Sequence, residues 1–230
     1  MTCAAILACA GSGVRMGADA DKLLLRLQER PVVAWSVEAL DACPQIDMLV
    51  VVASEHNLQR IAEIVEGMAT RLPLELVIGG ARRQDSVGRA VDALAGHAVD
   101  MVVVHDGARP LVSAALLERV ISAATEHGAA TAALALKNAC KEVDDEGFVV
   151  RSIERSSLVS VQTPQAFGYD ILARAHKEGR AQGAVVDDDA ELVERLGVAV
   201  KVVPGEHRNI KITTPDDLPI LEAHLAATPH

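Results

Sequence analysis

Short apolar runs rich in β-branched residues alternate with segments of helical periodicity, and this alternation limits the possible folds more than any other feature. The apolar runs lie at 4–9, 48–53, 74–78, 101–104, 130–136 and 198–203. Apolar spacing predicts helices over 31–40, 58–68, 87–94, 116–125 and 190–196. The alternation predicts an α/β fold with a doubly wound, mostly parallel, Rossmann-like sheet. A chain of 230 residues fits one such domain over 1–230.

Composition supports a buried sheet and argues against two classes of partner. Hydrophobic residues make up 50% of the chain but aromatic residues only 2%, so Ala, Val, Leu and Ile build the core, as in strands covered on both faces. A formal net charge of -10 argues against a protein that clamps nucleic acid. No apolar stretch is long enough to span a membrane. We therefore expect neither nucleic acid nor a membrane as a partner.

The cysteine pattern and the N-terminal sequence both favour a cytoplasmic location over secretion. Cys3, Cys9, Cys43 and Cys140 form no C-x-x-C pair and lack the His spacing of a zinc site. A signal peptide requires Lys or Arg ahead of its apolar run, and no Lys or Arg precedes the apolar N-terminal run here. We expect reduced thiols in a cytoplasmic protein.

A glycine-rich loop follows the first apolar run. Its sequence is Ala10-Gly11-Ser12-Gly13-Val14-Arg15-Met16-Gly17, and Lys22 follows it. Backbone N–H groups in such a loop can bind phosphate oxygens, and two nearby cations can neutralise developing negative charge. Met16 replaces the third glycine of a dinucleotide fingerprint, and no Gly-Lys-Ser/Thr of a Walker A loop follows. The loop is typical of a nucleotide site, with an ordinary glycine-rich turn as the alternative.

Two further polar clusters come directly after predicted strands. One is Gly79-Gly80 with Arg82-Arg83-Gln84-Asp85-Ser86, and the other is His105-Asp106-Gly107-Ala108-Arg109-Pro110. Ligands of open α/β sheets bind beyond the carboxyl ends of the strands, so we expect one composite site there. Asp106 can hold Mg²⁺, which binds one or two carboxylates together with substrate phosphates. The alternatives are simple turns with helix caps, and an Asp–Arg pair that only shapes a turn.

The C-terminal third carries four local expectations. Helix capping explains at least two of Asp187-Asp188-Asp189, while one of them could reach the site. We expect an ordered turn at 162–167 and place Lys211 on the polar face of a strand at 209–213. Thr214 as N-cap and Pro215 as first residue predict a terminal helix that runs toward His224.

The segment 137–158 breaks the alternation. Two strand-like pieces flank Asp144-Asp145-Glu146-Gly147, which predicts a β-hairpin arm. Such a polar hairpin has little core of its own and is marginal in isolation. We expect it to pack on another surface, such as a second subunit.

Taken in order, these motifs resemble those of the 2-C-methyl-D-erythritol 4-phosphate cytidylyltransferase family over about residues 4–225. The marks are the glycine-rich loop, Gly79-Gly80 with Asp85-Ser86-Val87, the segment 105–110, Gln162-Thr163-Pro164-Gln165 and Asn209-Ile210-Lys211-Ile212-Thr213. The resemblance implies transfer of CMP from CTP to methylerythritol phosphate with release of pyrophosphate, assisted by Mg²⁺ or another divalent cation. It also implies a homodimer through the arm.

The resemblance further implies roles for individual residues. Arg15 and Lys22 would be catalytic and stabilise the charged phosphorus centre, and Asp106 would serve the metal. Acceptor binding would fall to Arg109, Arg155, Thr163 and Lys211, with Arg109 and Arg155 acting across the dimer interface. The nucleotide would be bound by Cys9, Ala10, Gly11, Ser12, Gly13, Gly80, Ser86 and Asp106.

Several departures from the family's pattern leave alternatives for the acceptor. Cys9, Ala81, Ala139 and Asp187 stand where the family usually has other residues, and these positions concern base reading and the acceptor more than phosphate chemistry. One alternative is a cytidylyltransferase for another acceptor such as ribitol 5-phosphate, and another is a molybdenum-cofactor-type nucleotidyltransferase. A non-catalytic nucleotide sensor is the alternative from a different class, and the cations Arg15 and Lys22 argue against it.

Overall fold

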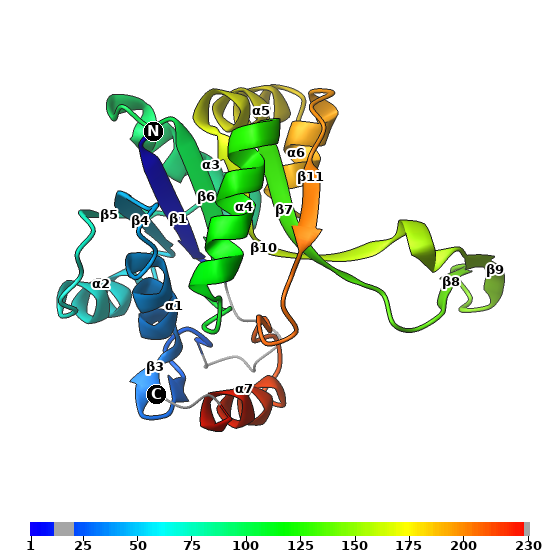
Figure 1. The fold of residues 1–230 in the computed structure, drawn as a ribbon, viewed down its shortest axis with the longest axis horizontal. Coiled ribbons are helices and arrows are strands. Elements are labelled where there is room, and N and C mark those ends of the chain that lie inside the picture. The colour runs from blue at the N-terminus through cyan, green and yellow to red at the C-terminus, as the bar shows by residue number, and fades with distance from the viewer. Residues whose placement is uncertain (12–20, 228–230) are drawn as a thin grey trace.

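A mixed seven-stranded sheet forms the centre of the molecule. The computed structural model describes residues 1–11 and 21–227, and its main sheet has the order β11-β7-β10-β6-β1-β4-β5 (Figure 1). Its strands are β1 (Cys3–Cys9), β4 (Met48–Ala53), β5 (Leu74–Ile78), β6 (Met101–Asp106), β7 (Ala129–Ala135), β10 (Val159–Gly168) and β11 (Lys201–Pro204). Short β2 (Arg26–Leu27) and β3 (Arg30–Pro31) form a separate hairpin. The predicted α/β fold is confirmed.

Helices cover both faces of this sheet. The helices of the described residues are α1 (Val32–Asp41), α2 (Leu58–Glu66), α3 (Arg83–Ala93), α4 (Ala114–His127), α5 (Tyr169–Ala181), α6 (Asp189–Arg195) and α7 (Asp217–Ala226), with short 3-10 turns at Leu94–Gly96 and Arg155–Ser157. Of these, α1 to α6 cover the sheet. Alternate residues of β1 enter two separate apolar clusters: Ala5 and Leu7 pack with α1, α2 and α4, and Ala4 and Ile6 pack with α3, α5 and α6. This double covering explains why β1 is apolar throughout.

None of the helices in the described ranges is both long and apolar enough to cross a membrane.

The strand β10 runs antiparallel to both of its neighbours, β6 and β7, while β1, β4, β5 and β6 are parallel to one another. Our expectation of a turn at 162–167 is therefore wrong. Proline cannot donate to a strand ladder, and Pro164 argues against a strand on local grounds. The sheet accommodates it because the register with β7 shifts between Val161 and Gln165.

The segment before the last helix is also different from our expectation. Residues 209–213 form no strand, so the prediction of Lys211 on a strand face is wrong. Ile212 is buried, and its N–H donates to the carbonyl of Ala108 at 2.9 Å, which holds this segment against the end of β6. These contacts, and not a strand ladder, hold the segment that carries Lys211.

The last helix begins later than the local signals predict. Asp216 is the N-cap of α7, two residues after Thr214. The carboxylate of Asp217 accepts the backbone N–H groups of Thr213 and Thr214 at 2.7 and 2.8 Å, so both residues stay outside the helix. Pro31 is likewise the N-cap of α1 and not its first residue. Figure 1 shows α7 beyond the end toward which β1 points.

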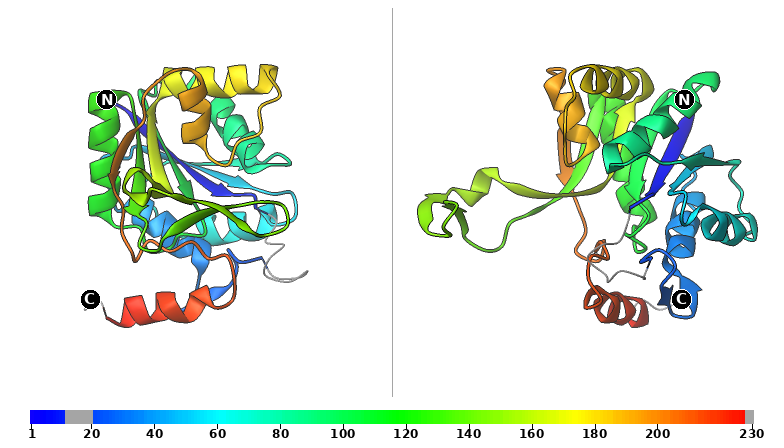
Figure 2. Two further views of the ribbon diagram at one scale, coloured as in Figure 1. Left: turned by 90° about the vertical axis from the view of Figure 1, so that its right-hand side faces the viewer. Right: turned by 180° about the vertical axis from the view of Figure 1, so that it is seen from behind.

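The predicted arm is present and projects from the rest of the molecule. Strands β8 (Cys140–Val143) and β9 (Val149–Ile153) pair with each other and with no strand of the main sheet (Figure 2). Asp144 closes the turn by accepting the backbone N–H groups of Glu146 and Phe148. Phe148, Val149 and Val150 are exposed on the arm. The hairpin thus has no apolar core within the described chain.

Candidate active site

Three cations surround Asp106 at the carboxyl end of β6. Its Oδ2 lies 2.7 Å from Lys211 Nζ and 3.7 Å from Arg109 Nε, and its Oδ1 lies 3.1 Å from Arg83 Nε. Burial alone would raise the pKa of Asp106, but Arg83, Lys211 and Arg109 outweigh it and hold that pKa far below its usual range. We call these four residues the Asp106 cluster.

The charges around Asp106 favour an anionic ligand. Together with Asp189, which pairs with Arg83, the Asp106 cluster contains two carboxylates and the cations of Arg83, Arg109 and Lys211. Three positive and two negative groups leave one positive charge in excess, which a phosphate can use.

A scaffold of buried polar side chains holds the cluster. Thr163 Oγ1 accepts the N–H of Asp106 at 3.0 Å and lies 3.1 Å from Nδ1 of His105, whose Nε2 lies 3.1 Å from the carbonyl of Arg109. Burial lowers the pKa of His105 to about 4, so its ring is neutral at pH 7. A carbonyl can only accept, so Nε2 carries the proton and Nδ1 accepts from Thr163.

Asn209 ties this scaffold to the segment that carries Lys211. Its Nδ2 donates to the carbonyl of Thr163 at 2.7 Å, and its own carbonyl accepts from Arg109 Nη1 at 2.8 Å. Both Thr163 and Asn209 are buried. Thr163 therefore supports the chain around Asp106 in this structure, and its expected role in binding substrate stays a prediction.

The Gly79-Gly80 loop packs directly against the end of β1. A Cβ atom on Gly79 would lie 2.5 Å from Ala10 Cβ and 2.7 Å from Ser86 Oγ, and one on Gly80 would lie 2.5 Å from Asp85 Cβ. Ser86 Oγ accepts the N–H of Gly80 at 3.1 Å and donates to the carbonyl of Arg82 at 3.0 Å. The structure thus brings together three of the residues expected to bind the nucleotide: Ala10, Gly80 and Ser86.

Asn57 joins the two sides of the glycine-rich segment. Its Nδ2 donates to the carbonyl of Cys9 at 3.1 Å and to Oδ2 of Asp21 at 2.7 Å. Lys22 comes next in the chain and is half-buried. Of the residues expected in this loop, Gly11 is described and exposed, whereas Ser12, Gly13 and Arg15 lie outside the described residues.

The thiol of Cys9 is enclosed in the interior of the protein. The side chain is fully buried, and a Cβ on Gly107 would lie 2.5 Å from its Sγ. Burial raises the pKa of the Cys9 thiol, Asp21 and Asp106 raise it further, and Lys22 lowers it. All four cysteines are free thiols, as expected.

Arg155 lies away from the Asp106 cluster. It sits in the 3-10 turn at the base of the arm, is exposed, and donates to the carbonyl of Lys137. Within the described part of a single chain, its hydrogen bond to Lys137 does not link it to any member of the cluster. Its expected role therefore stays a prediction.

The sequence analysis missed the environment of Arg83. Its Nη1 lies 2.7 Å from Oδ2 of Asp189, whose Oδ1 lies 3.1 Å from Nε2 of His176. Asp188 is the N-cap of α6 and accepts the N–H of Glu191, whereas Asp189 reaches the site, so capping hydrogen bonds explain one of the three aspartates and not the expected two or more. The position of Arg83 after Gly80 is a usable signal, but nothing local reveals its pairing with Asp189.

The residues around Asp106 do not fit a directly bound divalent cation. Both carboxylate oxygens already face cationic side chains, and a metal there would have to displace them. Among residues 1–11 and 21–227, no group of three or more His, Cys, Asp or Glu side chains is placed to hold a metal. The donor set suits a phosphate better than the expected metal at Asp106.

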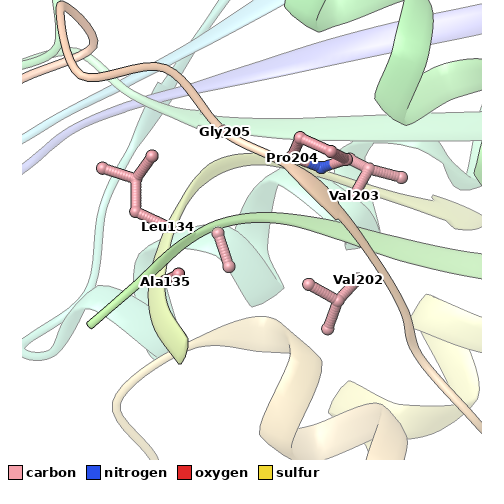
Figure 3. Close-up of a pocket in the computed structure, with 7 residues that line it drawn as sticks. Leu134, Ala135, Val202, Val203, Pro204 and Gly205 are labelled. Carbon is pink, nitrogen blue, oxygen red and sulfur yellow. The ribbon is translucent and has the colours of Figure 1, made fainter. Parts of the chain in front are cut away.

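A surface hollow lies at the edge of the sheet between β7 and β11. Ala133, Leu134, Ala135, Val202, Val203, Pro204 and Gly205 line it (Figure 3). These residues carry no titratable side chain, so the hollow supplies no acid, base or cation to the reaction.

Comparison with known proteins identifies the family. The model of the 2-C-methyl-D-erythritol 4-phosphate cytidylyltransferase family matches residues 3–227. A protein of that name from Pelotomaculum thermopropionicum is 44% identical over 226 residues, covering 97% of this chain and 94% of its own. One from Synechococcus sp. is 42% identical over 221 residues, covering 96% and 98%.

Solved structures agree with the sequence comparison. The 4-diphosphocytidyl-2C-methyl-D-erythritol synthase of Anaerococcus prevotii is 30% identical with a TM-score of 0.86, covering 98% of this chain and 96% of its own. The 2-C-methyl-D-erythritol 4-phosphate cytidylyltransferase of Thermus thermophilus is 31% identical with a TM-score of 0.79, covering 99% and 100%. The chain therefore belongs to the 2-C-methyl-D-erythritol 4-phosphate cytidylyltransferase family, a family of nucleotidyltransferases.

Proposed function

We propose that this enzyme transfers CMP from CTP to 2-C-methyl-D-erythritol 4-phosphate and releases pyrophosphate, as a cytoplasmic step of non-mevalonate isoprenoid precursor synthesis. The observation that carries this proposal is the Asp106 cluster, in which three cations meet one buried carboxylate beside the Gly79-Gly80 loop. That arrangement suits a phosphate group bound at the carboxyl ends of the strands. Membership of the family supplies the identity of the two substrates.

The reaction needs positioning and charge neutralisation more than proton transfer. An oxygen of the acceptor's phosphate attacks the α-phosphorus of CTP, a new P–O bond forms, and the P–O bond to pyrophosphate breaks in line. The negative charge that builds up around phosphorus is stabilised by fixed cations. We assign this role to Arg15 and Lys22.

The remaining residues divide between the two substrates. We assign Gly11, Ser12 and Gly13 to the triphosphate, and Cys9, Ala10, Gly80 and Ser86 to the cytosine. Lys211 and Arg109 would bind the acceptor's phosphate. Asp106 holds both of these cations at 2.7 and 3.7 Å, so it can keep them in place until the phosphate arrives.

Nucleotidyltransferases in general use a divalent cation, which offsets triphosphate charge when bound. Because both oxygens of Asp106 face cations, we expect the cation to be held mainly through the triphosphate oxygens. We route no step of the reaction through a metal on Asp106.

We further propose that the enzyme is a homodimer in which the arm packs on the second copy. Phe148, Val149 and Val150 are 67%, 59% and 59% exposed in the single chain, and the arm has no core of its own. Burying these side chains against another subunit would remove apolar area from water. Arg155 at the base of the arm would then act at the acceptor's phosphate across the interface.

Pyrophosphate release in the presence of CTP tests the function. Incubation with methylerythritol phosphate is expected to give clearly faster release than incubation with ribitol 5-phosphate, with CTP alone as the blank. Equal or faster turnover of ribitol 5-phosphate would overturn the proposed acceptor. CTP binding without turnover of either acceptor would favour a nucleotide sensor.

A further inference from the structure

Asp189 is a fully buried carboxylate with a basic partner on each oxygen. Its Oδ2 lies 2.7 Å from Arg83 Nη1, and its Oδ1 lies 3.1 Å from Nε2 of His176, which is itself buried. A carboxylate only accepts, so the His176 N–H donates to it. An ionised group so far from water requires partners of this kind, and Asp189 is thereby fixed in one orientation.

Capping of α6 does not explain this arrangement. Asp188 already provides the N-cap, since its Oδ1 accepts the N–H of Glu191 at 2.9 Å. Asp189 follows it in the first turn, and its carboxylate pairs with Arg83 at the start of α3. The two carboxylates therefore have separate tasks.

Arg83 connects Asp189 to the Asp106 cluster. Its Nε donates to Asp106 Oδ1 at 3.1 Å while its Nη1 donates to Asp189 at 2.7 Å. The donors of a guanidinium lie in one plane at fixed angles, so anchoring one of them sets the direction of the other. The orientation of Asp106, at the end of β6, thus depends through Arg83 on Asp189 at the start of α6.

We propose that Asp189 is a positioning residue for cytidylyl transfer, which anchors Arg83 so that Arg83 fixes the carboxylate on which Lys211 rests. This inference rests on the proposed function. With Oδ1 of Asp106 held by Arg83, Oδ2 stays directed at Lys211 and Arg109. Without the anchor the carboxylate can turn, and Lys211 shifts relative to the acceptor's phosphate. Displacements of about 1 Å in such positioning groups cost up to about a hundredfold in rate.

A double-mutant cycle of Asp189→Asn and Arg83→Lys tests the inference. Asparagine keeps the size but removes the charge, and lysine keeps the charge but cannot bridge two carboxylates as a fork. We expect each single variant to lose about tenfold or more in kcat, with KM for CTP changed less than about twofold. The kcat of the double variant is expected to be no more than about threefold below that of the worse single variant, because both changes break the same Asp189–Arg83 ion pair. Losses that multiply, or a wild-type kcat in folded Asp189→Asn, would overturn the proposal.

Matched controls separate positioning from folding. Glu191→Gln alters the same helix, where Glu191 contacts Arg195 at 2.7 Å and no member of the Asp106 cluster, so we expect wild-type kcat. Thermal unfolding verifies that each variant is folded. If Asp189→Asn does not fold, Asp189→Glu keeps the charge but displaces the oxygens by one methylene. We expect the same non-additivity with Arg83→Lys.

An NMR measurement distinguishes failure of this inference from failure of the proposed function. The Nε–H resonance of Arg83, assigned by its loss in Arg83→Lys, is expected to shift and to exchange faster with solvent in Asp189→Asn. An unchanged resonance would show that Asp189 does not anchor Arg83, whatever the activity. A wild-type enzyme inactive with CTP and methylerythritol phosphate would instead reject the proposed function.

Discussion

Lys22 is the one proposed catalytic cation that the structure describes. It follows Asp21, which accepts from Asn57, and precedes Leu23, which is 1% exposed. Its neighbours are thus fixed on both sides, which restricts where the lysine side chain can reach. A cation that is positioned in advance stabilises a transition state at little reorganisation cost.

Lys22→Ala is expected to lower kcat by at least about a hundredfold, while the Kd for CTP changes less than about threefold, since the charge is needed most as the α-phosphorus is attacked. Single-turnover kinetics and CTP titration measure the two quantities separately. Arg26→Ala is the control, because Arg26 is an exposed cation that pairs with Glu29. Loss of CTP binding with normal turnover of the bound complex would contradict the assigned role.

At the residue scale, the sequence predicts those site members that follow a strand directly. Asp106 and Arg109 come at the end of β6, and Gly80 follows β5. Asp189 could not be predicted in the same way, since it pairs with Arg83 across 106 positions of sequence. Only the packing of α6 against α5 and α3 against α5 brings such residues together.

Two strands were predicted with their exact bounds, β4 and β5. β4 is apolar and buried throughout, whereas β5 is a half-buried edge strand that includes Glu75 and ends at Gly79-Gly80. We did not predict α5, whose buried face consists of Leu172, Ala175, His176 and Gly179 and so contains a single large apolar side chain. The strand β10 was missed because Pro164 is tolerated only through a register shift in the sheet.

The arm is the element on which assembly is expected to depend. Phe148→Asp together with Val150→Asp places charges on its exposed apolar side chains, and we expect a dimeric wild type to become mainly monomeric and less active. Burial of unpaired carboxylates in an interface is costly. Sedimentation velocity at micromolar concentration measures the change. Ile220→Asp, on α7 and 48% exposed, serves as a control that should stay dimeric. A wild-type monomer with full activity would exclude shared sites.

For the whole molecule, His105 makes stability depend on pH. Burial lowers its pKa from 6.5 to about 4, so the unfolded chain binds a proton between these pH values and the folded chain does not. Stability therefore falls on acidification through this window, by about 3 kcal/mol in total. Urea unfolding at pH 7, 5.5 and 4 measures the free energy of unfolding. His105→Asn should reduce the loss of unfolding free energy between pH 7 and pH 4. An unchanged loss would contradict the assignment of this pH dependence to His105.

The antiparallel direction of β10 has a consequence for the enzyme as an assembly. Since β6 and β7 both run against β10, the last residue of β7 and the first of β10 leave the sheet at the same edge as Asp106. The hairpin between these two strands therefore leaves the sheet at the end where the Asp106 cluster lies (Figure 1). If β10 ran the other way, the chain would have to cross from the Asp106 end of β7 to the opposite end of the sheet before entering β10, and a short hairpin at the Asp106 end could not join the two strands.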